Sequence, residues 1–462
     1  MVPSAPADLS TAAGLPARLL TLCPSLTTAK ALCVALSGGL DSMVLLHLLL
    51  QLQTNGLLPA RLRALHIHHG LQSDADKWQQ HCRQWCEQWQ LPFVACKVSV
   101  NQQQGESLEA AAREARYTAF AAELQPGEVL VQAHHANDQA ETLLLRLLRG
   151  SGLQGLGGMP AARELAQGSL LRPLLAVTRE ELHDYATTHA LPWVEDPSNA
   201  DPRFDRNYLR ATLMPLLQAR WPAAVLSLGR SAELAQEAAG LLDALAAQDL
   251  AAAPAEFPNR LPLSLLRPLD PARQRNLLRH WLAQQPLQLQ GAAMSYQNLQ
   301  RAIAELVTPP ACEHVWLEWG EGEQVLQLHR YRDWLYLLKP LPPAPAARLW
   351  NLVQPLGLPA PLGSLHWHIP GKSVIDLPQQ LQLRFRSGSE HMVKADGHHQ
   401  SLKNHWQQRG IPPWLRDCVP LLYHGEELVA IGEEILAGST LGKIVGNMRP
   451  LAWQRAVLLC GW

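Results

Sequence analysis

Short strand-like segments alternate with longer helix-like segments through the first 150 residues, and this alternation constrains the fold most. Residues 31–36, "ALCVAL", are apolar and partly β-branched, which predicts a buried strand, whereas the Leu-rich residues 42–53 predict a buried helix. The same pattern continues with strands at 61–69, 92–100 and 128–135 and helices at 73–89, 107–124 and 137–150. We therefore expect an α/β fold with a doubly wound parallel sheet.

Polar residues cluster where three of these strands end, at 37–42, 66–70 and 134–138. In doubly wound sheets, ligands bind beyond the carboxyl ends of the strands. The topology therefore predicts one ligand site made from three segments that lie far apart in the sequence.

The turn "SGGLDS" at 37–42 joins the first strand to its helix. Gly38 and Gly39 tolerate positive φ, and the free N–H groups of the first helical turn add positive potential. These properties favour an anion cradle, with phosphate as the guest. A tight turn with Asp41 or Ser37 as the helix cap is the alternative that the residues alone leave open.

The pattern changes after about residue 215. Residues 227–253 are amphipathic and rich in Ala, Leu and Gln, residues 314–340 predict short strands, and residues 340–348 form a proline-rich linker. We expect a catalytic domain at 1–215, a mainly helical middle domain at 216–340 and a small α/β C-terminal domain at 349–462.

The net charge of the chain gives no electrostatic argument for binding to nucleic acid. The 39 Lys and Arg residues and 40 Asp and Glu residues give a net charge of -1, so any RNA must bind a local patch. The 8 cysteines form no C-x-x-C pair, which predicts reduced thiols. We find neither a secretory leader nor a membrane-spanning apolar run, and therefore expect a cytoplasmic, soluble protein without a membrane partner.

Three local clusters allow two interpretations each. Cys82 and Cys86 lie one helical turn apart, where packing is favoured over metal binding. His66 and His68 share a strand face, and hydrogen bonding near a ligand is favoured over zinc. In "HANDQAE" at 135–141, acids at a helix start suit capping, yet Asp138 beside two histidines suits Mg²⁺ binding or substrate orientation.

The stretch at 196–210 interleaves arginines with aromatic residues. Its members are Arg203, Phe204, Arg206, Tyr208 and Arg210. Such groups suit phosphates and unstacked bases, which favours an RNA contact. A solvated helix start with ion pairs is the alternative, since acidic residues lie among the arginines.

The turn at 37–42 resembles the pyrophosphate loop of the N-type ATP pyrophosphatases. The stretches "HIHHGLQ", "EAAAREARY", "AHHANDQAETLLLRLLRGSGLQGLGGM", "RPLL", "WVEDPSNADPRFDRNYLR" and "SLKNHWQQRGIPPWLRDCVPLL" are similar to those of tRNA(Ile)-lysidine synthetases. The resemblance extends over nearly the whole chain. The chain departs from the family pattern at Asn137, where many relatives have aspartate, so Asp138 is the stronger candidate for a required carboxylate. It also departs at His68, where some relatives have another residue, and we assign His68 no catalytic role.

The resemblance implies a reaction. ATP adenylates the C2 oxygen of the first anticodon cytidine in an isoleucine tRNA with a CAU anticodon, and the ε-amine of free L-lysine then displaces AMP to give lysidine. Codon reading would change from AUG to AUA. ATP and Mg²⁺ are the implied cofactors, and a homodimer is a state that the sequence leaves open.

The resemblance and the positions together assign roles to residues. We expect Ser37, Gly38, Gly39, Leu40, Asp41 and Ser42 to hold the ATP phosphates. Asp41, which also holds Mg²⁺, is expected to be catalytic with His135 and Asp138. The candidates for tRNA or phosphate contact are Arg113, Arg116, Arg149, Arg203, Arg206, Arg210, Lys403, Arg409 and Arg416.

Three other functions compete with this one. ATP-dependent tRNA thiolation uses the same fold but usually needs cysteine pairs, which are absent. A catalytically inactive RNA-binding module is disfavoured by the intact "SGGLDS" and "DQAET". A small-molecule amidotransferase partner is disfavoured by the two further domains.

Overall fold

The structure is a computed structural model of the full chain. It describes residues 14–70, 74–100, 108–196, 203–253, 258–286, 293–308, 315–360, 362–368, 378–388, 390–394, 396–445 and 450–454. The chain divides into two compact units, Met1–Leu241 and Leu242–Trp462. Each unit is described by itself below.

A six-stranded sheet organises the first unit, with the strand order β3-β2-β1-β4-β6-β5. Its strands are β1 (Ala31–Ala35), β2 (Arg61–His68), β3 (Phe93–Lys97), β4 (Val129–Val131), β5 (Ala162–Leu165) and β6 (Gly168–Leu171). Neighbouring strands from β3 to β6 run parallel, and the edge strand β5 pairs antiparallel with β6. The predicted doubly wound, mainly parallel sheet is confirmed.

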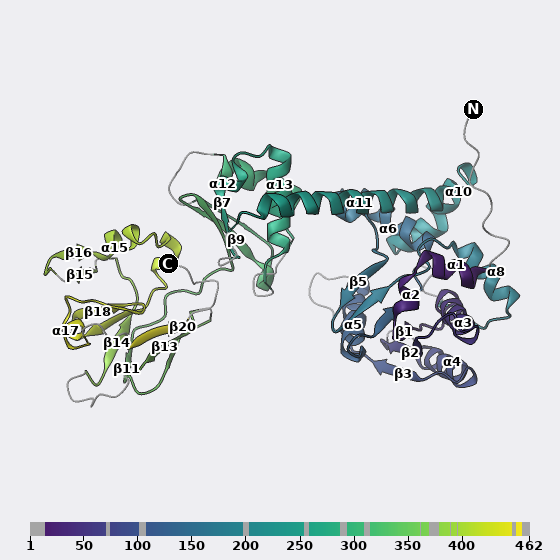
Figure 1. Ribbon diagram of the computed structural model, residues 1–462, viewed down its shortest axis with the longest axis horizontal. Helices are drawn as coiled ribbons and strands as arrows, with labels where there is room; N and C mark the ends of the chain where they lie inside the picture. Colours follow the sequence, from purple (N-terminus) through teal and green to yellow (C-terminus); the bar gives the residue numbers. More distant parts are fainter. Residues whose placement is uncertain are drawn as a thin grey trace. The chain divides into compact units, whose positions relative to one another are not determined.

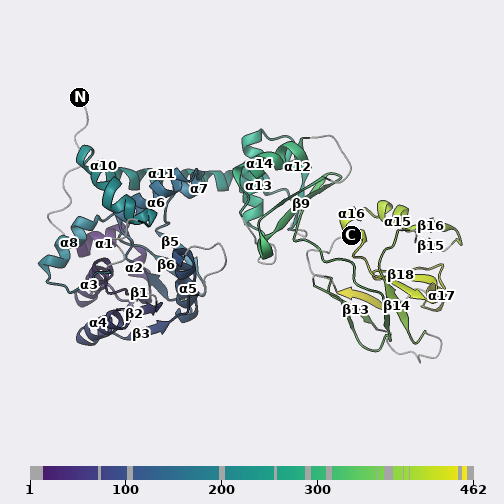
Figure 2. The same ribbon diagram turned by 180° about the vertical axis from the view of Figure 1, so that it is seen from behind.

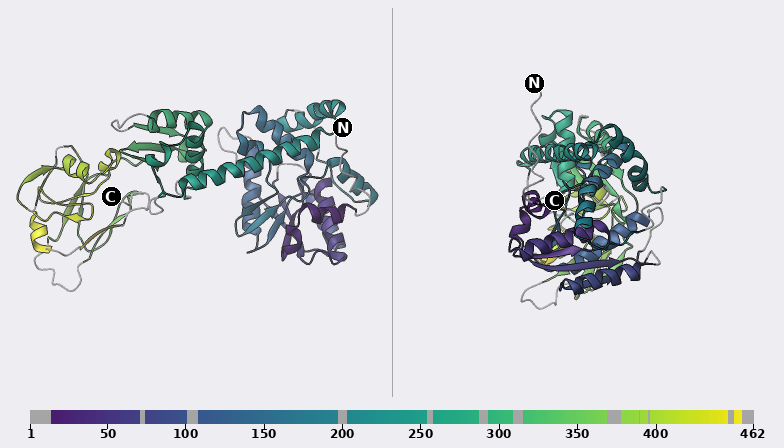
Figure 3. Two further views of the ribbon diagram at one scale, coloured as in Figure 1. Left: turned by 45° about the horizontal axis from the view of Figure 1, so that its top comes forward. Right: turned by 90° about the vertical axis from the view of Figure 1, so that its right-hand side faces the viewer.

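Helices connect and cover these strands. They are α1 (Leu15–Leu22), α2 (Ser25–Thr28), α3 (Leu40–Thr54), α4 (Ala75–Gln88), α5 (Leu108–Glu123), α6 (Ala136–Leu148), α7 (Leu153–Leu156), α8 (Arg179–Thr188), α9 (Asp205–Tyr208), a π-helical turn (Leu209–Leu213), α10 (Met214–Arg220) and α11 (Ala224–Leu250). Helix α11 is one unbroken helix of 27 residues, within which the division between the units falls (Figure 3). The predicted boundary at residue 215 therefore lies before the end of the first unit.

Both faces of the sheet are buried, as expected for parallel strands. Along β1, Leu32 and Val34 join the hydrophobic cluster under α3 and α4, whereas Cys33 joins the cluster under α5. Figure 1 shows α3 and α4 on one side of the strands and α5 on the other. The period-two alternation of β1 thus contributes to two separate cores.

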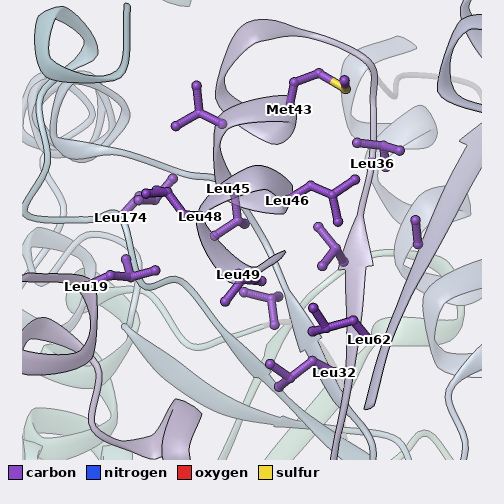
Figure 4. Packing of buried hydrophobic residues seen from close by; sticks show 14 of the residues in the cluster. Leu19, Leu32, Leu36, Met43, Leu45, Leu46, Leu48, Leu49, Leu62 and Leu174 are labelled. Atoms are coloured by element: carbon purple, nitrogen blue, oxygen red, sulfur yellow. The ribbon is translucent and has the colours of Figure 1, made fainter. Parts of the chain in front are cut away.

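Helix α3 lies within the larger of these cores. Leu45, Leu46 and Leu49 are fully buried, and Figure 4 shows them beside Leu32 of β1 and Leu62 of β2. This packing fixes the start of α3, and with it the 37–42 turn, against the sheet.

The first part of the second unit combines helices with an antiparallel sheet of order β7-β10-β9-β8. The elements are β7 (Arg260–Pro262), α12 (Leu263–Leu266), α13 (Pro271–Ala283), α14 (Tyr296–Ala302), a π-helical turn (Ile303–Val307), β8 (Val315–Trp319), a 3-10 turn (Gly322–Gln324), β9 (Leu326–Tyr331) and β10 (Trp334–Leu338). The helices gather on one side of the sheet (Figure 2) and share one hydrophobic core with it. Strands β8, β9 and β10 correspond to the short strands expected at 314–340, and with α11 before them residues 216–340 contain more helix than strand.

The second part of this unit is rich in short strands. They are β11 (Arg348–Trp350), β12 (Leu356–Gly357), β13 (Ser364–Trp367), β14 (Leu381–Arg384), β15 (His391–Val393), β16 (His399–Ser401), β17 (Leu421–His424), β18 (Glu427–Ile431), β19 (Glu434–Ile435) and β20 (Leu451–Gln454). Three short helices accompany them, α15 (Leu402–Gln408), α16 (Pro413–Arg416) and α17 (Thr440–Val445). Their shared core includes Trp406, which is fully buried.

Among the helices that the structure describes, none combines the length and the apolar character needed to cross a bilayer.

Candidate active site at the ends of β1 and β4

The candidate site lies where β1 and β4 end side by side. These two strands are paired and parallel, so their carboxyl ends meet at the same edge of the sheet. Residues 37–42 follow β1, and His135, which directly precedes α6, follows β4. Strand order reverses between β1 and β4, which is the position where sheets of this type bind ligands.

Hydroxyl groups hold the 37–42 turn in shape. The Ser42 Oγ donates to the Gly39 carbonyl at 2.9 Å and lies 3.1 Å from the Ser37 Oγ, which in turn accepts from the Gly39 N–H at 3.3 Å. The first turn of α3 then presents N–H groups that have no partner within the helix. The turn is therefore shaped before any anion arrives.

Gly38 can be replaced by no other residue without strain. Its φ is +88°, and a Cβ there would lie 3.0 Å from the Cys82 Sγ and 3.2 Å from the Val194 Cγ2. The Gly38 carbonyl also accepts from the Val194 N–H at 3.0 Å. The missing side chain therefore lets the turn lie directly on α4 and on the segment after α8.

His135 lies between two carboxylates. Its Nε2 is 3.6 Å from the Asp41 Oδ2 and 3.5 Å from the Asp138 Oδ2, and its side chain is almost fully buried. Asp138 accepts from the His135 backbone N–H at 3.1 Å, so the start of α6 is capped by the same carboxylate. The structure thus brings together the three residues predicted to be catalytic.

The two carboxylates differ in their tendency to ionise. Burial raises the pKa of Asp41, an effect that His135 opposes and Asp138 reinforces. Burial also acts on Asp138, but the neighbouring His135 and Arg206 outweigh it and lower the pKa of that carboxyl. Asp138 is therefore the firmly ionised member of the pair.

A buried glutamate anchors two arginines to this site. Glu141 on α6 is 1 % exposed and accepts from the Nε of Arg206 at 3.0 Å. Arg210 donates to both Glu141 oxygens and reaches the Asp138 Oδ1 at 3.2 Å. Sequence reasoning named both arginines but assigned no role to Glu141, because an acid near the start of a helix is explained by the helix dipole alone.

A second hydrogen-bond network includes His134. Arg172 is 3 % exposed, and its Nε donates to the His134 Nδ1 at 3.2 Å. Burial, with the nearby arginines, lowers the pKa of His134 to about 3, so its imidazole is neutral. Sequence reasoning assigned no role to Arg172, although it quoted the stretch "RPLL" that contains it.

Other predicted contact residues lie outside this cluster. In the first unit, Arg113 lies over the Tyr117 ring, Arg149 pairs with Asp205, Arg116 is half-buried and Arg203 is exposed. In the second unit, Lys403 is exposed and Arg409 pairs with Glu434. Arg416 is 5 % exposed and donates to the Ile411 carbonyl, so we withdraw it as an RNA contact.

The histidine and cysteine clusters singled out in the sequence lie within the part of the chain that the structure describes. Among the described residues, no group of three or more His, Cys, Asp or Glu side chains could hold a metal ion. Cys82 and Cys86 are fully buried in the core, as predicted, and burial raises the pKa of each thiol to about 12. Cys312 and Cys460 lie outside the described residues.

Three family models match this chain. A PP-loop domain matches residues 15–217, a TilS substrate binding domain matches 261–336 and a TilS substrate C-terminal domain matches 381–440. The first model covers β1, β4 and every catalytic candidate. Among solved structures, a U34-tRNA thiolase from Methanococcus maripaludis is a distant neighbour, with 16% identity and a TM-score of 0.39 over 48% of this chain and 78% of its own.

Curated relatives named tRNA(Ile)-lysidine synthase match most of the chain. The protein of Alkalilimnicola ehrlichii is 47% identical over 87% of this chain and 89% of its own length. That of Pseudomonas fluorescens is 43% identical over 90% and 92%, and that of Escherichia coli O157:H7 is 42% identical over 89% and 94%. Identity at this level along nearly the full length shows that the chain belongs to the tRNA(Ile)-lysidine synthase family.

Proposed function

We propose that this chain converts the first anticodon cytidine of a CAU-bearing isoleucine tRNA to lysidine, with free L-lysine as the nucleophile. Codon reading thereby changes from AUG to AUA. The observation that supports this most strongly is the meeting of Asp41, His135 and Asp138 beside a preformed 37–42 turn, in a chain of this family. We place the reaction in the cytoplasm, where tRNA and ATP occur together.

In the first step, the cytidine O2 attacks the α-phosphorus of ATP, and the bond to the pyrophosphate oxygen breaks. Negative charge builds up on the phosphate oxygens and must be stabilised by donors that are already in position. The first turn of α3, at the end of residues 37–42, supplies backbone N–H groups for this purpose, while the Ser37 and Ser42 hydroxyls hold the turn in shape. Arg206 and Arg210 add positive charge at the reacting centre while Glu141 fixes their direction.

The donor set also fits Mg²⁺. The Asp41 Oδ1 is buried and has no hydrogen-bond partner among the described residues, so a carboxylate oxygen remains for a cation. Mg²⁺ is typically held by one or two carboxylates together with substrate phosphates. When bound there, it would supply neutralising charge to the phosphates.

In the second step, the lysine ε-amine attacks C2 and AMP leaves. The amine must lose a proton, which requires a nearby acceptor. We assign this transfer to His135, because its Nε2 faces both Asp41 and Asp138 and the latter is the more firmly ionised carboxylate, which can stabilise a protonated imidazole. Thiolation has no comparable support, since burial raises the pKa of Cys82, the thiol beneath the turn, to about 12.

The test is incorporation of labelled lysine into a tRNA transcript with a CAU anticodon, with and without ATP. A matched transcript whose first anticodon base is uridine serves as the substrate control. We expect label in the cytidine transcript alone, and only with ATP. Pyrophosphate release without lysine incorporation would show that a different nucleophile is used.

A further inference from the structure

Two arginines approach the ring of Tyr117 in the first unit. The Cζ of Arg113 lies 5.1 Å from the ring centroid, and the Cζ of Arg163 lies 4.8 Å from it. Arg113 and Tyr117 are one turn apart on α5, whereas Arg163 comes from β5. Both arginines are exposed and the tyrosine is half-buried. Cation–π attraction therefore holds two surface guanidinium groups over one partly buried ring.

The phenol of Tyr117 is itself anchored. Its hydroxyl donates to the Gln132 Oε1 at 3.2 Å and accepts from Arg172 at 3.1 Å. Arg172 also donates to the Pro160 carbonyl and to His134, which precedes the catalytic candidate His135. Two hydrogen bonds thus connect the ring under the surface arginines to the segment at the reacting centre.

These two arginines differ from Arg149, Arg206 and Arg210 in what balances their charge. Arg206 and Arg210 are paired with Glu141, and Arg149 is paired with Asp205. Among the residues that the structure describes, no carboxylate forms an ion pair with Arg113 or Arg163. Such a guanidinium is exposed and held in position, and its N–H groups do not donate to a carboxylate of that part of the chain. It is therefore suited to bind a phosphate of another molecule.

We propose that Arg113, Tyr117 and Arg163 form a clamp for backbone phosphates of the RNA strand that carries the modified cytidine. Arg113 and Arg163 bind the phosphates, and Tyr117 is a positioning residue that holds both guanidinium groups and ties them to the His134 segment. The proposal rests on the function proposed above, because it takes tRNA as the polyanion. It adds Tyr117 and Arg163, to which the analysis of the sequence assigned no role.

The test measures binding of a labelled anticodon stem-loop RNA to the full-length protein by fluorescence anisotropy at several salt concentrations. The variants are Arg113→Gln, Arg163→Gln, Tyr117→Leu and Tyr117→Phe. Arg83→Gln is the matched control, because Arg83 is also exposed and also lies over an aromatic ring, that of Phe93 at 5.2 Å, but on α4 and β3.

We expect Arg113→Gln and Arg163→Gln each to weaken binding about three- to tenfold near physiological salt and to lower the salt slope by about 0.7 to 0.9, as loss of one phosphate contact does. Tyr117→Leu should weaken binding without changing the salt slope, because both charges remain. Tyr117→Phe keeps the ring and should retain most of the affinity. Arg83→Gln should bind as the wild type does.

Wild-type affinity in both arginine variants would overturn the proposal, and so would an equal loss in Arg83→Gln, which would indicate non-specific attraction. Unchanged binding in Tyr117→Leu would overturn the positioning role. These outcomes are separate from the fate of the proposed function: a wild-type protein that binds the RNA but incorporates no lysine refutes lysidine synthesis, while the binding comparison still decides the clamp.

Discussion

Arg210 donates to both carboxylate oxygens of Glu141, with its Nε 2.8 Å from one oxygen and its second nitrogen 3.0 Å from the other. Glu141 is buried, so the pair is shielded from water on the acidic side. A two-point contact of this kind fixes the plane of the guanidinium as well as its distance. The direction in which Arg210 meets Asp138 is therefore set by a residue one turn further along α6.

Replacing Glu141 with Gln should reduce both activity and stability. The substitution removes the negative charge that Arg206 and Arg210 share, and among the described residues Arg210 then keeps only its ion pair with Asp138. Breaking a largely buried ion pair in this way costs about 3 kcal/mol. Because the arginines also lose their alignment, we expect lysine incorporation to fall about 100-fold or more. Thermal unfolding and the labelled-lysine assay measure the two effects.

The control for this variant is Asp205→Asn, which breaks the Arg149–Asp205 pair. Both side chains of that pair are largely exposed, at 69% and 73%, so its loss should change stability by less than about 0.5 kcal/mol. Equal destabilisation by both substitutions would contradict the anchoring role of Glu141.

Gly38→Ala should disable the turn. The added methyl group would meet Cys82 and Val194 at a backbone φ of +88°, so strain and overlap act together. We expect a loss of about 2 kcal/mol in unfolding free energy and a large drop in kcat/KM for ATP. Gly56→Ala is the control for backbone strain without steric overlap, because Gly56 has a φ of +72° and a Cβ there would have nothing within 4 Å. A Gly38→Ala enzyme with normal ATP kinetics would show that the turn does not bind the phosphates.

Asp41→Asn should separate activity from stability. Burial raises the pKa of Asp41, so ionising this carboxyl group is less favourable in the folded protein than in the unfolded chain. Stability is therefore lost as the pH rises through the raised pKa. The neutral amide removes the cost, so the melting temperature near pH 8 should rise slightly while lysine incorporation is lost. A melting temperature that falls in the variant would mean that the charge of Asp41 stabilises the fold.

His134 should make the protein less stable in mild acid. Its pKa is lowered to about 3 in the folded state, against an ordinary value near 6.5 in the unfolded chain. Below about pH 6.5 the unfolded chain takes up a proton that the folded protein refuses, so stability should fall by about 2 kcal/mol between pH 7 and pH 5. The slope of melting temperature against pH should be shallower in His134→Gln. An unchanged slope would show that groups other than His134 cause the loss of stability in acid.

The sheet of the first unit could be predicted because its strands and helices differ strongly in local pattern. The expected strand at 31–36 and helix at 42–53 correspond to β1 and α3, with shifts confined to their ends. The proximity of Asp41 and His135 followed from topology, since both lie at carboxyl ends of strands. Sequence pattern was sufficient here because the topology of a parallel sheet determines both the order of strands and helices and the edge where the strands end.

Glu141 and Arg172 could not be predicted in the same way. Each forms contacts with residues distant in the sequence, and nothing in their neighbourhoods distinguishes a buried anchor from an exposed charge. Arg416 shows the converse, because an arginine in a polar stretch predicts a surface contact, yet it lies buried against Ile411. The four-stranded sheet at 260–338 was predicted in part: the strands expected at 314–340 are β8, β9 and β10, whereas β7 has three residues, too few for a periodic pattern.

The pairing of β1 with β4 has a consequence for how the enzyme is made. β1 ends at Ala35 and β4 begins at Val129, and just three residue pairs join them. Contacts between such distant parts of a chain form late, because a long loop must close first. During synthesis, residues 37–42 are translated well before His135, Asp138 and Val194, so the site that we propose for ATP activation is assembled late in folding.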